Sequence, residues 1–474
     1  MKNTDDIWDL ADRHSERFIT LSDAVFDTPE TLYTEFKSVA AHRESLVEQG
    51  FRITDNAGGL PTAVIGEAGE GGPVIAILGE FDALPGLSQH SGETSPRAIE
   101  DGGHGHGCGH NLFGAGALLA ATALKDWIEA NNINARVRYY GCPAEEGGAA
   151  KTYMVREGLF DDVDAAISWH PAPYLAVNQE PSLANARIDY TFYGTASHAA
   201  FEPDMGRSAL DAVELMNVGV NYMREHMPDA ARVHYAYMDA GGVAANVVQA
   251  RARVRQLIRH PNLPGLKDLI ARVDKIAEGA ALMTETRMEK KVYSGVSNLL
   301  PNRPLEDAMQ TAVEQLGPVP FDDKDRAFAA EIQATLPKGA VQSTLASMDY
   351  TPAADQDISL CDFILPLDRN GVVRAGSTDV GDVSWAVPTV QLWGATWTLG
   401  TPFHTWQVVA HGKTGLAHKG MIHAAKVMAG TARMLIENPE LLADAKAAHT
   451  AHLANTPYEC PIPEETEPPI VQPS

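Results

Sequence analysis

The feature that most limits the fold is an alternation of short apolar runs with longer helical patterns between residues 73 and 169. The run P-V-I-A-I-L at 73–78 is typical of a buried strand, and residues 112–128 have the spacing of a helix. Further strands are predicted at 135–141 and 164–169. Strands that alternate with helices predict an α/β domain, with a mostly parallel sheet and helices on both faces.

From residue 184 the pattern changes to strand, helix, two strands, helix and strand. This order predicts a ferredoxin-like α+β domain inserted at 184–299. The flanking segments 1–183 and 300–455 are then two parts of one catalytic domain, which agrees with a length of 474 residues, too long for a single ordinary core. An excursion with little periodicity is expected near 335–370. The Pro- and Glu-rich residues 456–474 predict an extended tail.

Charge and composition narrow the classes of function. A formal net charge of −25 argues against nucleic-acid binding, which needs a basic patch. No apolar run reaches the roughly 18 residues of a membrane-spanning helix, and the polar, acidic start is unlike an export signal. The four cysteines are far apart and form no C-x-x-C pair, so we expect reduced thiols. The sequence therefore predicts a cytoplasmic protein that binds neither nucleic acid nor membrane.

Polar residues follow each predicted strand of the catalytic domain. Glu80 and Asp82 follow the first strand, Glu145 and Glu146 the second, and His170 the third. The carboxyl ends of parallel strands share one edge of a sheet, where ligands bind in such folds. A glutamate pair alone is most often solvated surface, and a histidine at a strand end is most often structural. The prediction of a site therefore rests on their convergence.

The loop H-G-H-G-C-G-H-N at 104–111 adds metal-binding groups to this edge. Cys108 and His110 are separated by one glycine, and thiolate, imidazole and carboxylate are the usual ligands of zinc. A structural zinc site needs only four ligands, whereas a hydrolytic site needs a base beside the metal-activated water, whose pKa falls to about 7. The spare carboxylate of the glutamate pair favours the hydrolytic site. Asn111 is expected to cap the helix that follows.

Five motifs together resemble the amidohydrolase branch of the zinc aminoacylase and carboxypeptidase family. They are G-E-F-D-A-L-P, G-H-G-C-G-H-N, G-C-P-A-E-E-G-G, S-W-H-P and T-A-S-H-A-A. The resemblance covers nearly the whole chain and is weakest around residues 335–370. It implies two divalent metal ions per chain, with zinc favoured by the thiolate and manganese as the alternative.

The resemblance also implies a role for each candidate residue. The implied metal ligands are Cys108, His110, Glu146, His170 and His404. Glu145 would be the general base, and Asp82 would orient a ligand without binding metal. In the insert, His198 would reach across a dimer to polarise the substrate carbonyl, and Asn246 would be a second contact. Arg207 is a candidate clamp for a substrate carboxylate, with a surface salt bridge as the equal alternative.

The implied reaction is hydrolysis of a small N-acyl or N-aroyl amino acid, with p-aminobenzoyl-glutamate favoured. Dipeptides, hippurate-type or indoleacetyl-amino acids, and carbamoyl-amino acids are alternative substrates on the same scaffold. The insert would act as a lid and dimerisation domain, so we expect a homodimer or a heterodimer with a related subunit. A metal-binding partner subunit without turnover is the alternative of a different class. The presence of both Glu145 and His198 counts against it.

Overall fold

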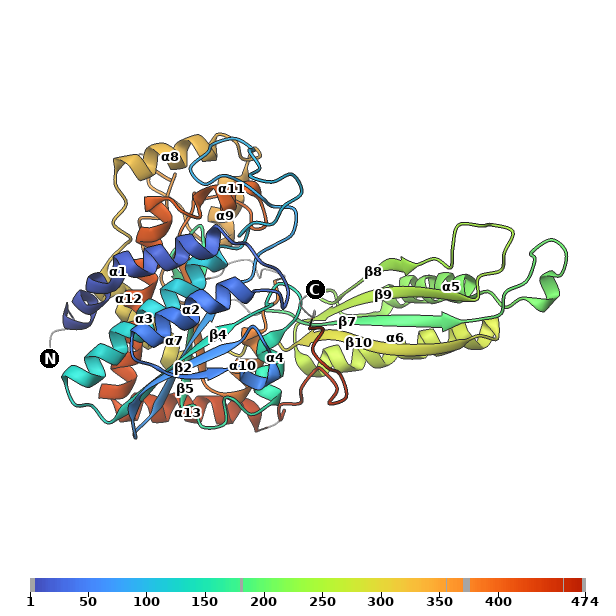
Figure 1. Cartoon of the computed structure of the whole chain (residues 1–474), viewed down its shortest axis with the longest axis horizontal. Coiled ribbons are helices and arrows are strands. Elements are labelled where there is room, and N and C mark those ends of the chain that lie inside the picture. The colour runs from blue at the N-terminus through green and yellow to red at the C-terminus, as the bar shows by residue number, and fades with distance from the viewer. Residues whose placement is uncertain (1–4, 180–181, 355, 370–375, 455, 471–474) are drawn as a thin grey trace.

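The computed structural model describes residues 5–179, 182–354, 356–369, 376–454 and 456–470. It has two sheets, a large mixed one and a smaller antiparallel one, in two parts of the molecule that lie side by side (Figure 1). The first and last parts of the chain build the larger part around the mixed sheet. Parts of the predicted excursion and tail, at 355, 370 and 471–474, lie outside the described residues.

The large sheet has seven strands in the order β1-β2-β4-β3-β5-β11-β6. Its centre is parallel and consists of β4 (Ala135–Cys142), β3 (Val74–Glu80), β5 (Ala165–Ala172) and β11 (Thr389–Ala395). Its edges are antiparallel and consist of β1 (Arg52–Asp55), β2 (Val64–Glu70) and β6 (Ala176–Val177). The predicted α/β class with a mostly parallel sheet is confirmed.

Both faces of the sheet are covered, which explains why β3 is apolar along its whole length. Ile75 and Ile77 face one core with α3 (His110–Ala130) and α12 (Gly415–Glu437), whereas Leu78 faces a second core with α4 (Ala150–Arg156). Alternate strand residues point to opposite faces, so a strand buried on both sides shows no polar alternation. Each fully buried isoleucine or leucine contributes about 1.5–3 kcal/mol.

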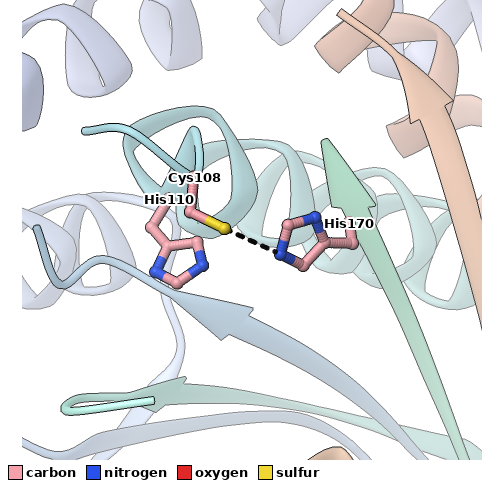
Figure 2. A group of neighbouring side chains, drawn as sticks. All are labelled: Cys108, His110 and His170. Atoms are coloured by element: carbon pink, nitrogen blue, oxygen red, sulfur yellow. Dashed lines mark hydrogen bonds between the residues drawn. The ribbon is translucent and has the colours of Figure 1, made fainter. Parts of the chain in front are cut away.

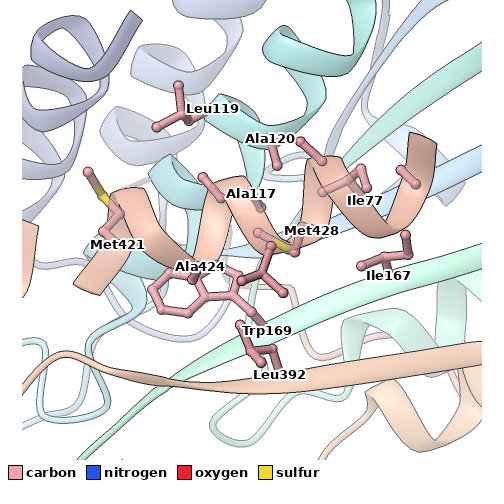
Figure 3. Packing of buried hydrophobic residues seen from close by; sticks show 14 of the residues in the cluster. Ile77, Ala117, Leu119, Ala120, Ile167, Trp169, Leu392, Met421, Ala424 and Met428 are labelled. Atoms are coloured by element: carbon pink, nitrogen blue, oxygen red, sulfur yellow. The ribbon is translucent and has the colours of Figure 1, made fainter. Parts of the chain in front are cut away.

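Trp169 of β5 is the largest side chain of the first core and lies between α3 and α12 (Figure 3). A Cβ at Gly116 would come within 2.9 Å of the Trp169 ring and 3.0 Å of Met421, so only glycine lets α3 approach so closely. Replacing this tryptophan with alanine is expected to cost about 3–5 kcal/mol. The remaining helices of this part are α1 (Asp5–Phe26), α2 (Phe36–Glu48), α7 (Arg303–Leu316), α8 (Asp323–Gln333), α9 (Ala340–Ser347), α10 (Val380–Ala386), α11 (Trp406–His411) and α13 (Pro439–Leu453).

The smaller sheet belongs to the insert and is antiparallel throughout, in the order β10-β7-β9-β8. Its elements along the chain are β7 (Ala184–Tyr193), α5 (Ala209–Met223), β8 (Arg232–Asp239), β9 (Arg251–His260), α6 (Leu263–Thr284) and β10 (Arg287–Val296). Both helices start at side-chain caps, because Ser208 accepts from the Asp211 amide and Asn262 from the Gly265 amide. The ferredoxin-like order predicted for the insert is the one observed.

Two segments are packed more closely than their composition suggests. In the excursion, Leu360, Cys361 and Leu365 are buried although no helix or strand holds them. In the tail, Ile462 is buried, and Arg156 donates hydrogen bonds to two tail carbonyls at 2.9 and 3.2 Å. The low periodicity of both segments reflects irregular backbone and does not mean exposure.

Candidate metal and catalytic site

The strand order places the predicted polar residues at one edge of the large sheet. Because β4, β3, β5 and β11 are neighbours, the segments that follow them meet at their carboxyl ends. Glu80 ends β3, the Glu145–Glu146 pair follows β4, His170 lies near the end of β5, and His404 follows β11. The arrangement is the one in which open α/β sheets bind ligands.

The five predicted metal ligands form two groups that share Cys108. Cys108, His110 and His170 offer ligand atoms within 4.8 Å of one another, and so do Cys108, Glu146 and His404. Figure 2 shows the first group, in which Cys108 Sγ lies 3.5 Å from His170 Nε2 and the His110 ring lies beside them. A thiolate shared by two groups can bridge two cations.

The helix that carries this loop starts differently from the prediction that Asn111 caps it. α3 begins at His110, and its N-cap is Gly109 in the left-handed conformation (φ 71°). Asn111 lies inside the first turn, and its amide donates to Ser22 Oγ and to the Gly412 carbonyl, both at 3.0 Å. The cap prediction was therefore wrong, and Asn111 instead fixes the loop to α1 and to the segment after α11.

Asp82 orients two parts of the site at once. Its Oδ1 accepts a hydrogen bond from His110 Nδ1 at 2.8 Å, and its Oδ2 accepts from the Glu146 amide at 2.9 Å. The first bond leaves His110 Nε2 without its proton and facing the group of ligands. His170 is fixed in the same way, since its Nδ1 donates to the Pro171 carbonyl at 2.6 Å and its Nε2 faces Cys108.

The atoms at this edge fit metal ions. Glu80 Oε2, His110 Nε2 and Glu146 Oε1 are buried and have no hydrogen-bond partner among the described residues. His110 Nε2 lies 3.3 Å from Glu80 Oε2, and His404 Nε2 lies 3.3 Å from Glu146 Oε1. Two ligands of one tetrahedral cation, bound at about 2.0–2.2 Å, lie roughly 3.3–3.6 Å apart. Orphaned donor atoms at ligand-to-ligand distances are what a metal centre requires.

Burial and charge divide the carboxylates into two kinds. Burial, together with the charges of Glu80 and Glu146, raises the pKa of Glu145 well above its usual range. Burial alone would also raise the pKa of Glu146, but its hydrogen bond to His404 and the charge of His110 lower it. Glu145 therefore holds a proton readily, whereas Glu146 stays ionised as a metal ligand must.

A cavity of about 510 Å³ opens beside this cluster and extends to the insert. Glu145 and Glu146 line it, and Arg187 of β7 and Arg259 of β9 line it from the insert. Burial and the charge of Arg255 lower the pKa of Arg187, and burial and the charge of Arg187 lower that of Arg259. The surroundings therefore do not fully compensate the two guanidiniums, so the cavity favours an anionic ligand.

The sequence interpretation missed both arginines. They lie on strands whose alternating pattern looks half-exposed, and the pattern does not show which end of the inserted sheet faces the catalytic domain. The available signal was that Arg187 and Arg259 fall at the catalytic-domain ends of their strands, since residues 184 and 260 are paired in the sheet.

His198, Asn246 and Arg207 lie together, but at the opposite end of the insert. Isolated bridges join His198 to Val247 and Arg207 to Thr195, beyond the far end of β7 (Figure 1). At about 3.3 Å per residue, the six residues from Arg187 to Tyr193 alone span roughly 20 Å. These three residues do not line the cavity of their own chain.

Two of these distal side chains have local contacts. Arg207 pairs with Glu285 at 2.9 Å and donates to carbonyls of its own loop, which is the surface salt bridge weighed against the clamp. His198 Nδ1 accepts from the Ala200 and Phe201 amides at 3.2 and 3.1 Å, so its Nε2 carries the proton and is exposed.

Comparison with known proteins identifies the scaffold. Residues 76–353 match peptidase family M20/M25/M40. The chain belongs to this family. Its resemblance to the metal-dependent aminoacylases and carboxypeptidases is thereby confirmed, and so is its assignment as a hydrolase.

Individual family members add detail. The chain is 44% identical over 468 residues to one p-aminobenzoyl-glutamate hydrolase subunit of Escherichia coli, covering 97% of each chain. It is 29% identical over 301 residues to the other hydrolase subunit of that name in the same bacterium, covering 60% of this chain and 67% of the relative. A dinuclear metal-binding family member from Bacillus subtilis superimposes with a TM-score of 0.59 at 18% identity, over 90% of this chain and 99% of its own. Within the described residues, no helix has the length and apolar character to cross a membrane.

Proposed function

We propose that this chain hydrolyses the amide bond of an N-aroyl or N-acyl amino acid, with p-aminobenzoyl-glutamate as the favoured substrate. The observation that carries the proposal is the cavity, which collects a protonatable buried carboxylate, metal-ligating atoms and two guanidiniums around about 510 Å³. The name of the 44% identical relative supports the choice of substrate.

Two divalent cations would be held by the two groups of ligands. Cys108, His110 and His170 would hold one, and Cys108, Glu146 and His404 the other. The thiolate favours zinc, with manganese as the alternative. When bound, such cations lower the pKa of water and polarise a carbonyl oxygen.

The chain's own residues move the proton. Glu145 takes a proton from the attacking water and later delivers it to the amide nitrogen, which leaves as the amine of the amino acid. Its pKa, raised by burial and by Glu80 and Glu146, suits a group that must keep the proton between these two steps. Asp82 holds His110 and the Glu146 amide in place throughout.

Arg187 and Arg259 would bind the carboxylates of the amino-acid half. A glutamate offers two carboxylates, and guanidinium binds carboxylate through paired hydrogen bonds. Gly147 lies between Arg187 and the glutamate pair, since a Cβ there would meet Arg187 Nη1 at 2.9 Å. A cationic side chain in this place would face two arginines. This argues against the preference named for another relative, the 28% identical Xaa-Arg dipeptidase of Mus musculus.

The insert would pair with a second copy of this chain or with a related hydrolase subunit. Apart from Val47 and Ile99, the large apolar side chains exposed among the described residues all lie in it, including Phe201, Tyr222 and Val243. Such a surface marks an interaction site. Pairing through it would carry His198 to the partner's cavity, where its exposed Nε2–H can donate to the substrate carbonyl. Four unpaired cysteines fit work in the reducing cytoplasm.

The test is release of free amino acid by the purified chain with zinc or manganese added. The panel contains p-aminobenzoyl-glutamate, hippurate, an indoleacetyl-amino acid, a carbamoyl-amino acid and a plain dipeptide, each with and without the 29% identical type of hydrolase subunit. We expect selective turnover of p-aminobenzoyl-glutamate. Glu145→Gln is expected to keep its metals and lose nearly all turnover. Equal rates across the panel, or an active Glu145→Gln, would remove the proposed substrate or the proposed base.

A further inference from the structure

The segment between α1 and α2 contacts the catalytic edge, although its sequence indicates only a break between two helices. The Glu30 carbonyl accepts a hydrogen bond from the Ala83 amide at 2.7 Å, directly after Asp82. The carboxylate of Glu30 accepts from the Lys37 and Ser38 amides at 2.9–3.0 Å, at the start of α2. The turn at residues 30–35 is therefore fixed to a helix on one side and to the loop after β3 on the other.

The same turn holds both ends of the loop that follows β4. Glu35 Oε1 accepts from the Ala144 amide at 3.0 Å, and the Tyr33 hydroxyl donates to the Gly148 carbonyl at 2.9 Å. Glu35 and Tyr33 are completely buried. A Cβ at Gly148 would lie 2.5 Å from the Tyr33 ring, so ring and loop are in direct contact.

The loop needs such support because its ends adopt an unfavourable backbone conformation. Ala144 and Ala149 have φ of 54° and 55°, in the left-handed region where a Cβ is strained. The turn is strained too, with Leu32 at φ 29° and Tyr33 at φ 60°. Strained residues persist only where their surroundings over-determine them, and they gather at functional sites.

We infer that Tyr33 and Glu35 are positioning residues that fix the Ala144–Ala149 loop, and with it the placement of Glu145 and Glu146 relative to Asp82. The inference rests on the proposed function for its catalytic consequence. Its structural content is that the loop is held at both ends by one turn from the start of the chain. Neither residue touches the cavity.

The experiment compares Tyr33→Phe, Glu35→Ala and Glu35→Gln with the wild-type chain. Zinc affinity is measured by competition with a chromophoric chelator, and kcat and KM are measured on p-aminobenzoyl-glutamate. Residues that support metal ligands typically change metal affinity or activity 10–100-fold, and we expect losses of about this size in Tyr33→Phe and Glu35→Ala, in kcat more than in KM. Glutamine keeps the oxygen that accepts from Ala144, so Glu35→Gln is expected to recover most of the loss.

Tyr140→Phe is the matched control. Tyr140 is equally buried, and its hydroxyl also donates to a backbone carbonyl, that of Leu159 at 2.6 Å, away from the loop. We expect it to lower the melting temperature about as much as Tyr33→Phe while zinc affinity and kcat stay at wild-type values. Wild-type zinc affinity in both Tyr33→Phe and Glu35→Ala would overturn the inference. A wild-type chain that turns over nothing would contradict the proposed function, and the zinc comparison would still decide the inference.

Discussion

Lys151 is the chain's most consequential buried charge, and its removal gives a sharp test of the electrostatics beside the site. Its ammonium lies 2.6 Å from Glu80 Oε1 and 2.7 Å from Asp379 Oδ1, and all three side chains are at most 1% exposed. Its amide also donates to Asp379 Oδ2 at 3.0 Å. The lysine thus joins the end of β3 to the start of α10, directly behind the metal ligands.

Lys151→Met keeps the length of the side chain and removes its charge. Breaking a buried ion pair by removing one partner costs about 3–5 kcal/mol, because the remaining charge is left without compensation. Burial already raises the pKa of Glu80 to about 7 with the lysine present, and removing the lysine raises it further. Between pH 4.5 and this raised pKa, the folded state binds more protons than the unfolded state. The penalty is therefore expected to grow as pH rises from about 6 to about 9.

The measurement is the free energy of unfolding in urea, with metals removed by a chelator, at about pH 6 and about pH 8.5. Lys413→Met is the control, since Lys413 pairs with Asp27 at 2.8 Å where both side chains are substantially exposed. It is expected to cost no more than about 1 kcal/mol. Adding Glu80→Gln to Lys151→Met should restore part of the loss. A Lys151→Met penalty equal to that of the control, or one independent of pH, would refute the reasoning.

Three further predictions follow from other parts of the molecule. Arg187→Met should raise KM for p-aminobenzoyl-glutamate about 10–100-fold, through loss of a charged hydrogen bond, and should spare its alanine analogue; unchanged selectivity would contradict the carboxylate contact. Arg255→Met is its control, since Arg255 pairs with Asp189. Equal mixing of inactive Glu145→Gln and His198→Ala chains should restore about a quarter of wild-type activity if each site draws on two subunits, and no recovery would exclude shared sites. Burial lowers the pKa of His423 from 6.5 to about 4, so the unfolded state binds more protons between these values, and stability falls as the pH falls through them. His423→Gln should remove about 3 kcal/mol of that fall in urea unfolding; parallel pH curves for both chains would disprove it.

The elements of the catalytic domain can be predicted from the sequence because local pattern determines them. Burial on both faces makes β3 an unbroken apolar run, and glycine and proline mark where the strands end. The family motifs then indicate which polar residues belong to the site. Five predicted ligands, from segments that end nearly 300 residues apart, lie in two groups around Cys108.

Other features depend on tertiary structure that no local pattern encodes. Arg187 and Arg207 are twenty residues apart on the same domain, and only the direction of β7 decides which of them faces the cavity. Glu35 resembles an ordinary surface glutamate near a helix start. Its burial follows from the packing of the α1–α2 turn against a loop more than 100 residues away.

The place of β11 in the large sheet has a consequence for how the chain is made. β11 lies between β5 and β6, yet it leaves the ribosome about 220 residues after β5. At 5–20 residues per second this interval is roughly 10 to 40 s. The inserted sheet is complete by Val296 and can finish folding first. During that time the nascent catalytic half has an open strand edge beside an unliganded Cys108. Biosynthesis of this protein is therefore most vulnerable to aggregation before His404 arrives.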